Sequence, residues 1–156
     1  MTQTEILILN FEEIRRRSIK LWSALSPENY HWKPDAAAMT CIEMIRHILE
    51  GEHLFHIIVN NRGDIGDYVS PWKNRVYTNL QDELDYAKPF RESFFKTIQS
   101  FSPEDLSTIE IIRIEKNQHR KLGDYLQRIA YHEAVHTGQM LSYYRTMGNG
   151  MPLIWD

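Results

Sequence analysis

The sequence predicts an all-α fold, a four-helix bundle, and two observations point to it. Four segments repeat apolar side chains at alternating spacings of three and four residues, the period of one face of an α-helix. A long link, residues 61–79, separates the second segment from the third, whereas short links join antiparallel neighbours. A helix pair, a crossover and a second helix pair is therefore the expected arrangement.

The expected helices begin and end at recognisable signals. They cover Thr4–Leu25, Thr40–Asn60, Leu80–Phe101 and Leu122–Met147. Ser26-Pro27 ends the first helix, and Gly148 ends the fourth. Pro89 falls inside the third and is expected to kink it. The β-branched stretch 108–115 predicts a short extended segment beside the bundle.

Bulk composition narrows the functional classes. A chain of 156 residues predicts a single domain, 1–156, and a net charge of −3 argues against nucleic acid as the main partner. The one cysteine, Cys41, allows no internal disulfide and is expected to be a buried, inert thiol. The N-terminus lacks the basic stretch of a signal peptide, and no apolar run is long enough to cross a bilayer. A cytoplasmic protein without membrane contacts is expected.

Three histidines interrupt apolar helix faces. His132 and His136 lie four residues apart, hence one turn apart on the fourth helix, and His47 falls on the apolar face of the second. Burying an imidazole in an apolar seam is unfavourable unless its nitrogens find partners, and a divalent metal is one such partner. Three protein ligands would leave a position open for water or substrate, as in catalytic sites. The alternative is a set of core histidines that bond to each other and to Glu50 or Gln139.

Polar residues beside these histidines are candidates to orient a ligand or move a proton. Glu43 and Glu50 flank His47, Glu133 follows His132, and Gln139 is almost in line with His132. Each is otherwise expected to be a solvated residue on a helix flank.

The remaining histidines and one arginine are expected to serve no site. His53 and His56 project away from His47, and His31 and His119 fall in predicted loops, so all four are expected on the solvated surface. Arg91 breaks the apolar face of the third helix. It would either meet an anionic ligand or extend to the surface beside Pro89.

Residues 132–136 also match H-E-x-x-H, the zinc-protease signature, with Glu133 as the base. The extended form of that motif fails, because Gln139 stands where glycine is needed and Ser142 where a third histidine is needed. No glutamate follows Glu133 to act as the third ligand. A protease is therefore disfavoured.

A longer pattern resembles a known family, the DinB/YfiT-like metalloenzymes (damage-inducible-type proteins). It consists of His47 preceded by Trp32-Lys33-Pro34, then the segment Tyr131–Met140, then Tyr144–Gly148 and Pro152. Within it, His132-x-x-x-His136-x-Gly138-Gln139 is the more specific part. Thr137 stands where members commonly carry arginine.

The resemblance implies an up-down-down-up four-helix bundle. It also implies a divalent metal, zinc or nickel, on residues matching His47, His132 and His136, and a homodimer. Some relatives are transferases or isomerases that use a low-molecular-weight thiol. A thiol-dependent S-transferase is therefore the leading hypothesis, with Glu133, Glu50 and Gln139 as the candidate catalytic residues. The alternatives are a non-catalytic metal- or ligand-binding stress-response protein and a metal-dependent hydrolase.

Overall fold

A computed structural model describes residues 1–155 of the chain. The elements along it are α1 (Gln3–Ser23), η1 (Pro27–Asn29), α2 (Cys41–Asn60), α3 (Leu80–Gln99), α4 (Pro103–Thr108), β1 (Glu110–Arg113), η2 (Ile114–Lys116), β2 (Gln118–Lys121) and α5 (Leu122–Met147). The predicted, mostly helical class is confirmed, with one small two-stranded sheet added to it.

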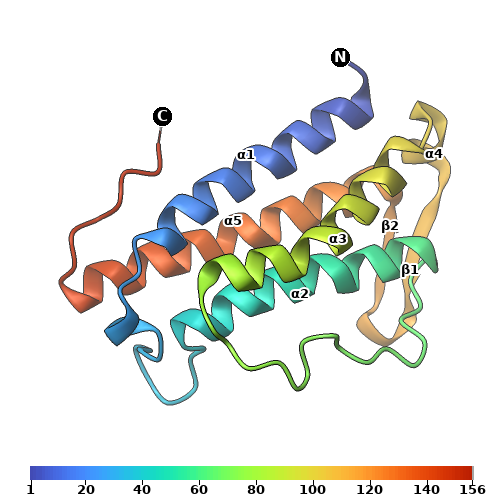
Figure 1. The fold of residues 1–156 in the computed structure, drawn as a ribbon. Coiled ribbons are helices and arrows are strands. Elements are labelled where there is room, and N and C mark those ends of the chain that lie inside the picture. The colour runs from blue at the N-terminus through green and yellow to red at the C-terminus, as the bar shows by residue number, and fades with distance from the viewer. Residues whose placement is uncertain (156) are drawn as a thin grey trace.

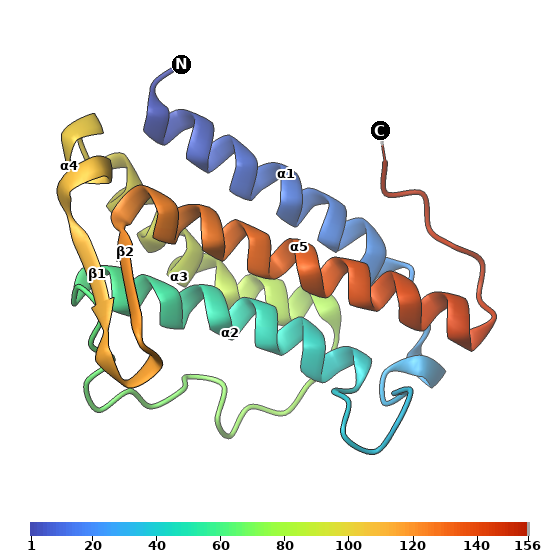
Figure 2. The same ribbon diagram turned by 180° about the vertical axis from the view of Figure 1, so that it is seen from behind.

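The four long helices lie side by side. Helices α1 and α5 run in one direction and α2 and α3 in the other, as Figure 1 shows. Both α1 and α2 pack against α3 and against α5. The link between α2 and α3 runs back along the molecule, as a connection between helices of the same direction must (Figure 1). Viewed from behind, α2 and α5 lie next to each other along the near face (Figure 2).

The ends of these helices follow from capping chemistry. Thr40 caps α2, and Glu43 completes a reciprocal capping box with it; Thr2 and Glu5 do the same for α1. At the other end of the chain, Gly148 adopts φ 74°, the left-handed conformation that terminates α5. Helices α1 and α3 end two residues before the predicted ends, whereas α5 has the predicted bounds.

The segment between α3 and α5 contains more secondary structure than the sequence predicted. Only an extended stretch at 108–115 was expected, but β1 pairs with β2 as an antiparallel hairpin, and α4 precedes it. The hairpin docks on the end of α2, where the Ile112 amide donates to the Arg62 carbonyl at 3.0 Å. A Cβ on Gly63, whose φ is 129°, would lie 1.8 Å from the Ile112 carbonyl oxygen, so only glycine fits this contact.

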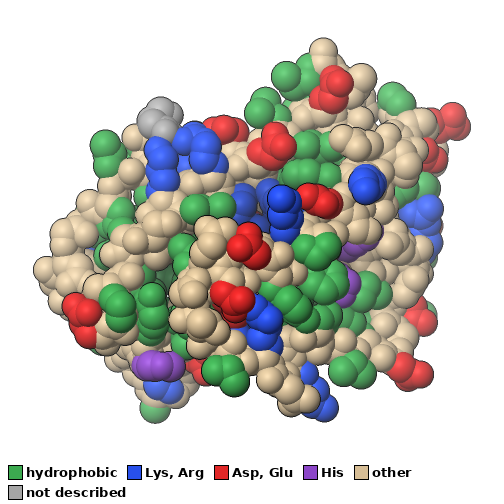
Figure 3. All heavy atoms as spheres, viewed as in Figure 1, with side chains coloured by type: hydrophobic (Ala, Val, Ile, Leu, Met, Phe, Trp, Pro, Cys, Tyr) green, Lys and Arg blue, Asp and Glu red, His purple; other side chains and the backbone are tan. Residues whose placement is uncertain are grey.

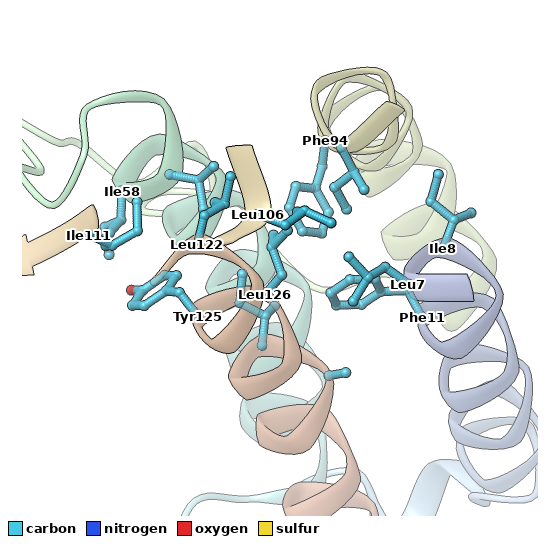
Figure 4. Close-up of a cluster of buried hydrophobic side chains, with 14 residues drawn as sticks. Leu7, Ile8, Phe11, Ile58, Phe94, Leu106, Ile111, Leu122, Tyr125 and Leu126 are labelled. Carbon is cyan, nitrogen blue, oxygen red and sulfur yellow. The ribbon is translucent and has the colours of Figure 1, made fainter. Parts of the chain in front are cut away.

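The buried core consists of two apolar clusters. Figure 4 shows the cluster near the hairpin, where Leu126 of α5 and Phe11 of α1 converge with Phe94 of α3. The other cluster lies toward the opposite end and includes Trp22 and Tyr144. On the surface, Lys and Arg side chains are interspersed with Asp and Glu over the face seen in Figure 3. Among residues 1–155, no helix combines the length and apolar character that a membrane span requires.

Candidate metal centre

The structure brings the three predicted histidines together between α2 and α5. His132 and His136 project from successive turns of α5, and His47 reaches them from α2. The Nε2 atom of His132 lies 3.0 Å from Nε2 of His47 and 3.1 Å from Nε2 of His136. One ligand nitrogen from each of the three lies within 4.8 Å of the others. The three form a single cluster, which we call the histidine centre.

The histidines cannot all satisfy one another. A ring nitrogen carries either one hydrogen or one lone pair in the ring plane, so Nε2 of His132 can make only one of its two contacts as a well-directed hydrogen bond. Nδ1 of His136 lies 2.6 Å from Oε1 of Gln139, an acceptor, so the His136 proton belongs on Nδ1 and its Nε2 presents a lone pair. At least one Nε2 therefore faces the centre without a complementary partner.

The surroundings favour the neutral forms of His132 and His47. Burial, followed by the proximity of His136 and His47, lowers the pKa of His132 to about 4. Burial and His136 also lower the pKa of His47, although Glu50 opposes this. A neutral imidazole is the form that binds a metal, so the lowered pKa values of His132 and His47 favour their action as ligands at neutral pH.

Two neighbours shape the room around His132. A Cβ added to Gly51 would lie 3.3 Å from Cε1 of His132, closer than an ordinary contact, so the glycine makes space for the ring. One turn further along α2, Phe55 packs edge-on against His132 with ring centroids 5.3 Å apart. The ring of His132 is thus held between α2 and its own helix.

Glu133 does not belong to the histidine centre. It is 5% exposed and faces α1, where its two carboxylate oxygens accept hydrogen bonds from Arg15 at 2.7 and 3.0 Å. Arg15 also reaches Glu52 of α2 at 3.4 Å, and Glu52 pairs with Arg91 of α3. Each of the four long helices therefore contributes one charged residue to a buried network, Arg15–Glu52–Arg91–Glu133, which we call the charge network.

The charge network compensates the burial of Glu133 fully and that of Glu52 only in part. Burial alone would raise the pKa of Glu133, but the charge and hydrogen bonds of Arg15 outweigh it and leave that pKa lowered. The pKa of Glu52 is raised, because its burial outweighs Arg15 and Arg91. Glu133 is thus committed to Arg15 and faces away from the histidines, which leaves no base in the protease position.

Of the other polar residues predicted to assist the histidines, one contacts the histidine centre directly and two do not. Gln139 contacts a histidine of the centre. Glu43 instead accepts from the Thr40 backbone at the start of α2, which is a capping role. Glu50 accepts from the Tyr68 hydroxyl at 3.4 Å and acts on His47 only through its charge.

Three predictions about single residues were wrong, and all three concern the packing of α3. His56 was expected on the surface but is 6% exposed, with Nε2 2.8 Å from the Thr97 hydroxyl of α3. His53 is half-buried, and its ring centroid lies 4.4 Å from that of Phe90, also of α3. Arg91 does not extend to the surface beside Pro89, because Glu52 and the Phe11 carbonyl hold it inside.

Other predictions agree with the structure. His31 and His119 are exposed, although His119 lies on β2 and pairs with Glu110. Cys41 is fully buried, and burial raises its pKa to about 11, as expected for an inert thiol. Helix α3 continues through Pro89, and the kink there stays a prediction.

The helical pattern of the sequence did not predict the roles of Arg15 and Glu52. Arg15 lies four residues after Phe11 and three before Ser18, so it shares their face of α1. Its place on an apolar face was a signal that could have indicated a buried partner. Glu52 was hidden because it follows Gly51 on the flank of the face that carries His47.

Fold and site together define a class: a helical protein with a cluster of three histidines between two neighbouring helices. Comparison with known proteins gives the family. The family model described as the DinB superfamily matches residues 10–140, and the chain belongs to that superfamily.

Relatives in Bacillus subtilis extend over nearly the whole chain. The uncharacterized protein YjoA of strain 168 is 26% identical over 150 residues, which is 96% of this chain and 94% of that protein. A crystal structure of a DinB-like protein, YjoA of Bacillus subtilis, has a TM-score of 0.69 and 25% identity, and it covers 96% of this chain and 97% of the other.

Proposed function

We propose that this protein is a divalent-metal-binding member of the DinB superfamily, with His47, His132 and His136 as the ligands. The four long helices would form an up-down-down-up bundle in one domain and hold α2 against α5 at the required distance. The observation that carries the proposal is the pair of contacts at Nε2 of His132, of which hydrogen bonding can satisfy only one.

The donor set fits such an ion. Two nitrogens bound to one tetrahedral zinc at ordinary bond lengths lie about 3.3 Å apart, close to the 3.0 and 3.1 Å found here. Imidazole suits zinc and nickel alike, so the donor set supports a divalent metal without selecting between them. Gln139 supports the proposal as well, because its bond to Nδ1 of His136 directs the Nε2 lone pair toward the centre.

Three protein ligands leave room for a further ligand, and we propose that this position serves chemistry on a small molecule. A bound divalent ion would lower the pKa of a thiol or a water placed there. Thiol-dependent S-transfer is the reaction that the family resemblance favours. Glu50, whose charge acts on His47, is then the carboxylate placed to take up a proton, because Glu133 is engaged by Arg15.

Metal titration of tag-free protein tests the first step. Zinc or cobalt should bind at one equivalent, and His132→Ala should reduce the affinity by roughly a hundredfold or more, since one of three ligands is lost. His53→Ala is the matched control, because His53 is also half-buried with a pKa lowered by burial, yet lies outside the centre. Undiminished binding by His132→Ala would show that other residues hold the metal, and no binding by the wild type would end the proposal.

The second step is tested separately. Binding of a low-molecular-weight thiol should introduce a sulfur-to-metal absorption band in the cobalt-substituted protein. Turnover with a thiol and an electrophilic acceptor would then distinguish a transferase from a protein that only binds.

A further inference from the structure

Arg128 is an unusual cation next to the histidine centre. It lies on α5 four residues, one helical turn, before His132, and it is partly buried. Among the described residues, its guanidinium has one polar partner, the neutral side-chain oxygen of Gln118 at 3.1 Å. Elsewhere in the fold, carboxylates pair with the buried or partly buried arginines Arg15, Arg46, Arg75, Arg91 and Arg113.

Tyr125 provides a second unsatisfied group at the same place. It precedes Arg128 by three residues on α5 and is 1% exposed; its buried hydroxyl makes no hydrogen bond of ordinary geometry among the described residues, although Arg113 lies close to it. Figure 4 shows this hydroxyl at the outer end of the ring, pointing away from Leu126. Burial raises the pKa of Tyr125, and the nearby charges of Arg113 and Arg128 oppose that rise. A hydroxyl donor and a cation without a carboxylate partner therefore lie together.

Opposite charges at the two ends of the site favour one orientation of a ligand. Glu50 accompanies His47 on α2, whereas Arg128 lies before His132 on α5, on the hairpin side. A guanidinium is always charged and presents a planar pair of donors that matches a carboxylate. An anionic group would therefore find its partner at the Arg128 end.

We propose that Arg128, supported by Tyr125, receives the carboxylate of a small-molecule ligand whose other end reaches the histidine centre. The inference rests on the proposed metal site and specifies its substrate class as carboxylate-bearing. Because side chains one turn apart on a helix are neighbours, the carboxylate and the metal-directed atom of the ligand are separated by only a few bonds.

Two thiols of equal length form the probe pair: 3-mercaptopropionate, which carries a carboxylate, and 3-mercapto-1-propanol, which carries a hydroxyl. Each is titrated anaerobically into the cobalt-substituted protein and followed by the sulfur-to-cobalt absorption. The wild type should bind the carboxylate thiol roughly tenfold more tightly than the alcohol, because a charge-assisted contact is added. Arg128→Gln should remove this preference and leave the affinity for the alcohol unchanged.

Two further variants make the test specific. Arg120→Gln removes an equal charge from the same end of the molecule, but Arg120 already pairs with Asp124, so the preference should persist. Arg128→Lys keeps the charge without the planar fork and should retain only part of the preference. It also keeps the inference testable if Arg128→Gln fails to fold.

The outcomes separate the two proposals. A wild type that binds no cobalt refutes the metal site itself. If the protein binds cobalt but then binds both thiols equally, or responds to neither, the carboxylate inference is overturned and the metal site is retained. A preference that survives Arg128→Gln assigns the recognition to another residue and also overturns it.

Discussion

His132 and Glu133 are neighbours in the sequence but belong to two different regions of the molecule. His132 is one of three imidazoles in a seam between two helices, at the margin of the fold. Glu133 joins the charge network inside, to which α1, α2, α3 and α5 each contribute a residue. Hydrogen bonds within the histidine centre cannot satisfy all of its ring nitrogens, whereas each carboxylate of the charge network pairs with an arginine. That difference indicates a site for a ligand in one region and a structural element in the other.

The largest expected effect comes from breaking the charge network. Glu133→Gln removes the carboxylate that Arg15 contacts twice and leaves a buried guanidinium without its main partner. Removing one member of a buried pair typically costs about 3–5 kcal/mol, so the free energy of unfolding should fall by about that amount. Urea denaturation measures it.

Glu13→Gln is the matched control for that experiment. Glu13 also pairs with two arginines of α1, Arg16 and Arg17, but at the surface, where solvent screens the pairs. Its effect should be much smaller than that of Glu133→Gln. Equal stability of the two variants would contradict a structural role for the charge network.

Metal binding should stabilise the fold through the histidine centre alone. At an ion concentration about 100 times the dissociation constant, linkage adds roughly 2.7 kcal/mol to the free energy of unfolding. Unfolding with and without metal should give this increment in the wild type and in Glu133→Gln, and at most about 0.4 kcal/mol in His132→Ala. An increment that vanished in Glu133→Gln would show that the two regions are coupled.

Replacing Gln139 tests how the centre is prepared for the ion. Without Oε1 of Gln139, Nδ1 of His136 loses the partner that fixes its proton, and Gln139→Ala should weaken metal binding roughly 10- to 100-fold. Gln127→Ala is the control, since Gln127 lies on the same helix but contacts Asn10 of α1. Calorimetric titration compares the two, and indistinguishable affinities would remove Gln139 from the site.

The two regions differ in how well the sequence predicted them. Helical periodicity places His47, His132 and His136 on apolar faces, and apolar faces of neighbouring helices meet, so the histidine centre was predictable. The charge network was not, because Arg15 and Glu133 lie 118 positions apart and pair only once the rotation of both helices is fixed. Periodicity indicates which face is buried, but it does not indicate which residues meet across it.

The same reason explains the errors around α3. His56 was expected on the surface because it lies opposite His47 on α2, yet that opposite face packs against α3, where Thr97 supplies a partner. A helix with neighbours on both sides has two buried faces, and a single apolar stripe identifies only one of them. The short helix α4 was missed although Ser102, Pro103 and Asp105 form a recognisable helix start.

The smallest expected effect concerns Gly51, which makes room for His132. In Gly51→Ala, alanine favours the helix by up to about 1 kcal/mol, but the new methyl would lie 3.3 Å from Cε1 of His132 and displace the ring. Stability should therefore change by less than about 1 kcal/mol, while displacement of one ligand should lower metal affinity severalfold. Thermal unfolding and metal titration of the same sample separate the two effects. Unchanged affinity would show that the ring of His132 can shift without loss of the ligand geometry.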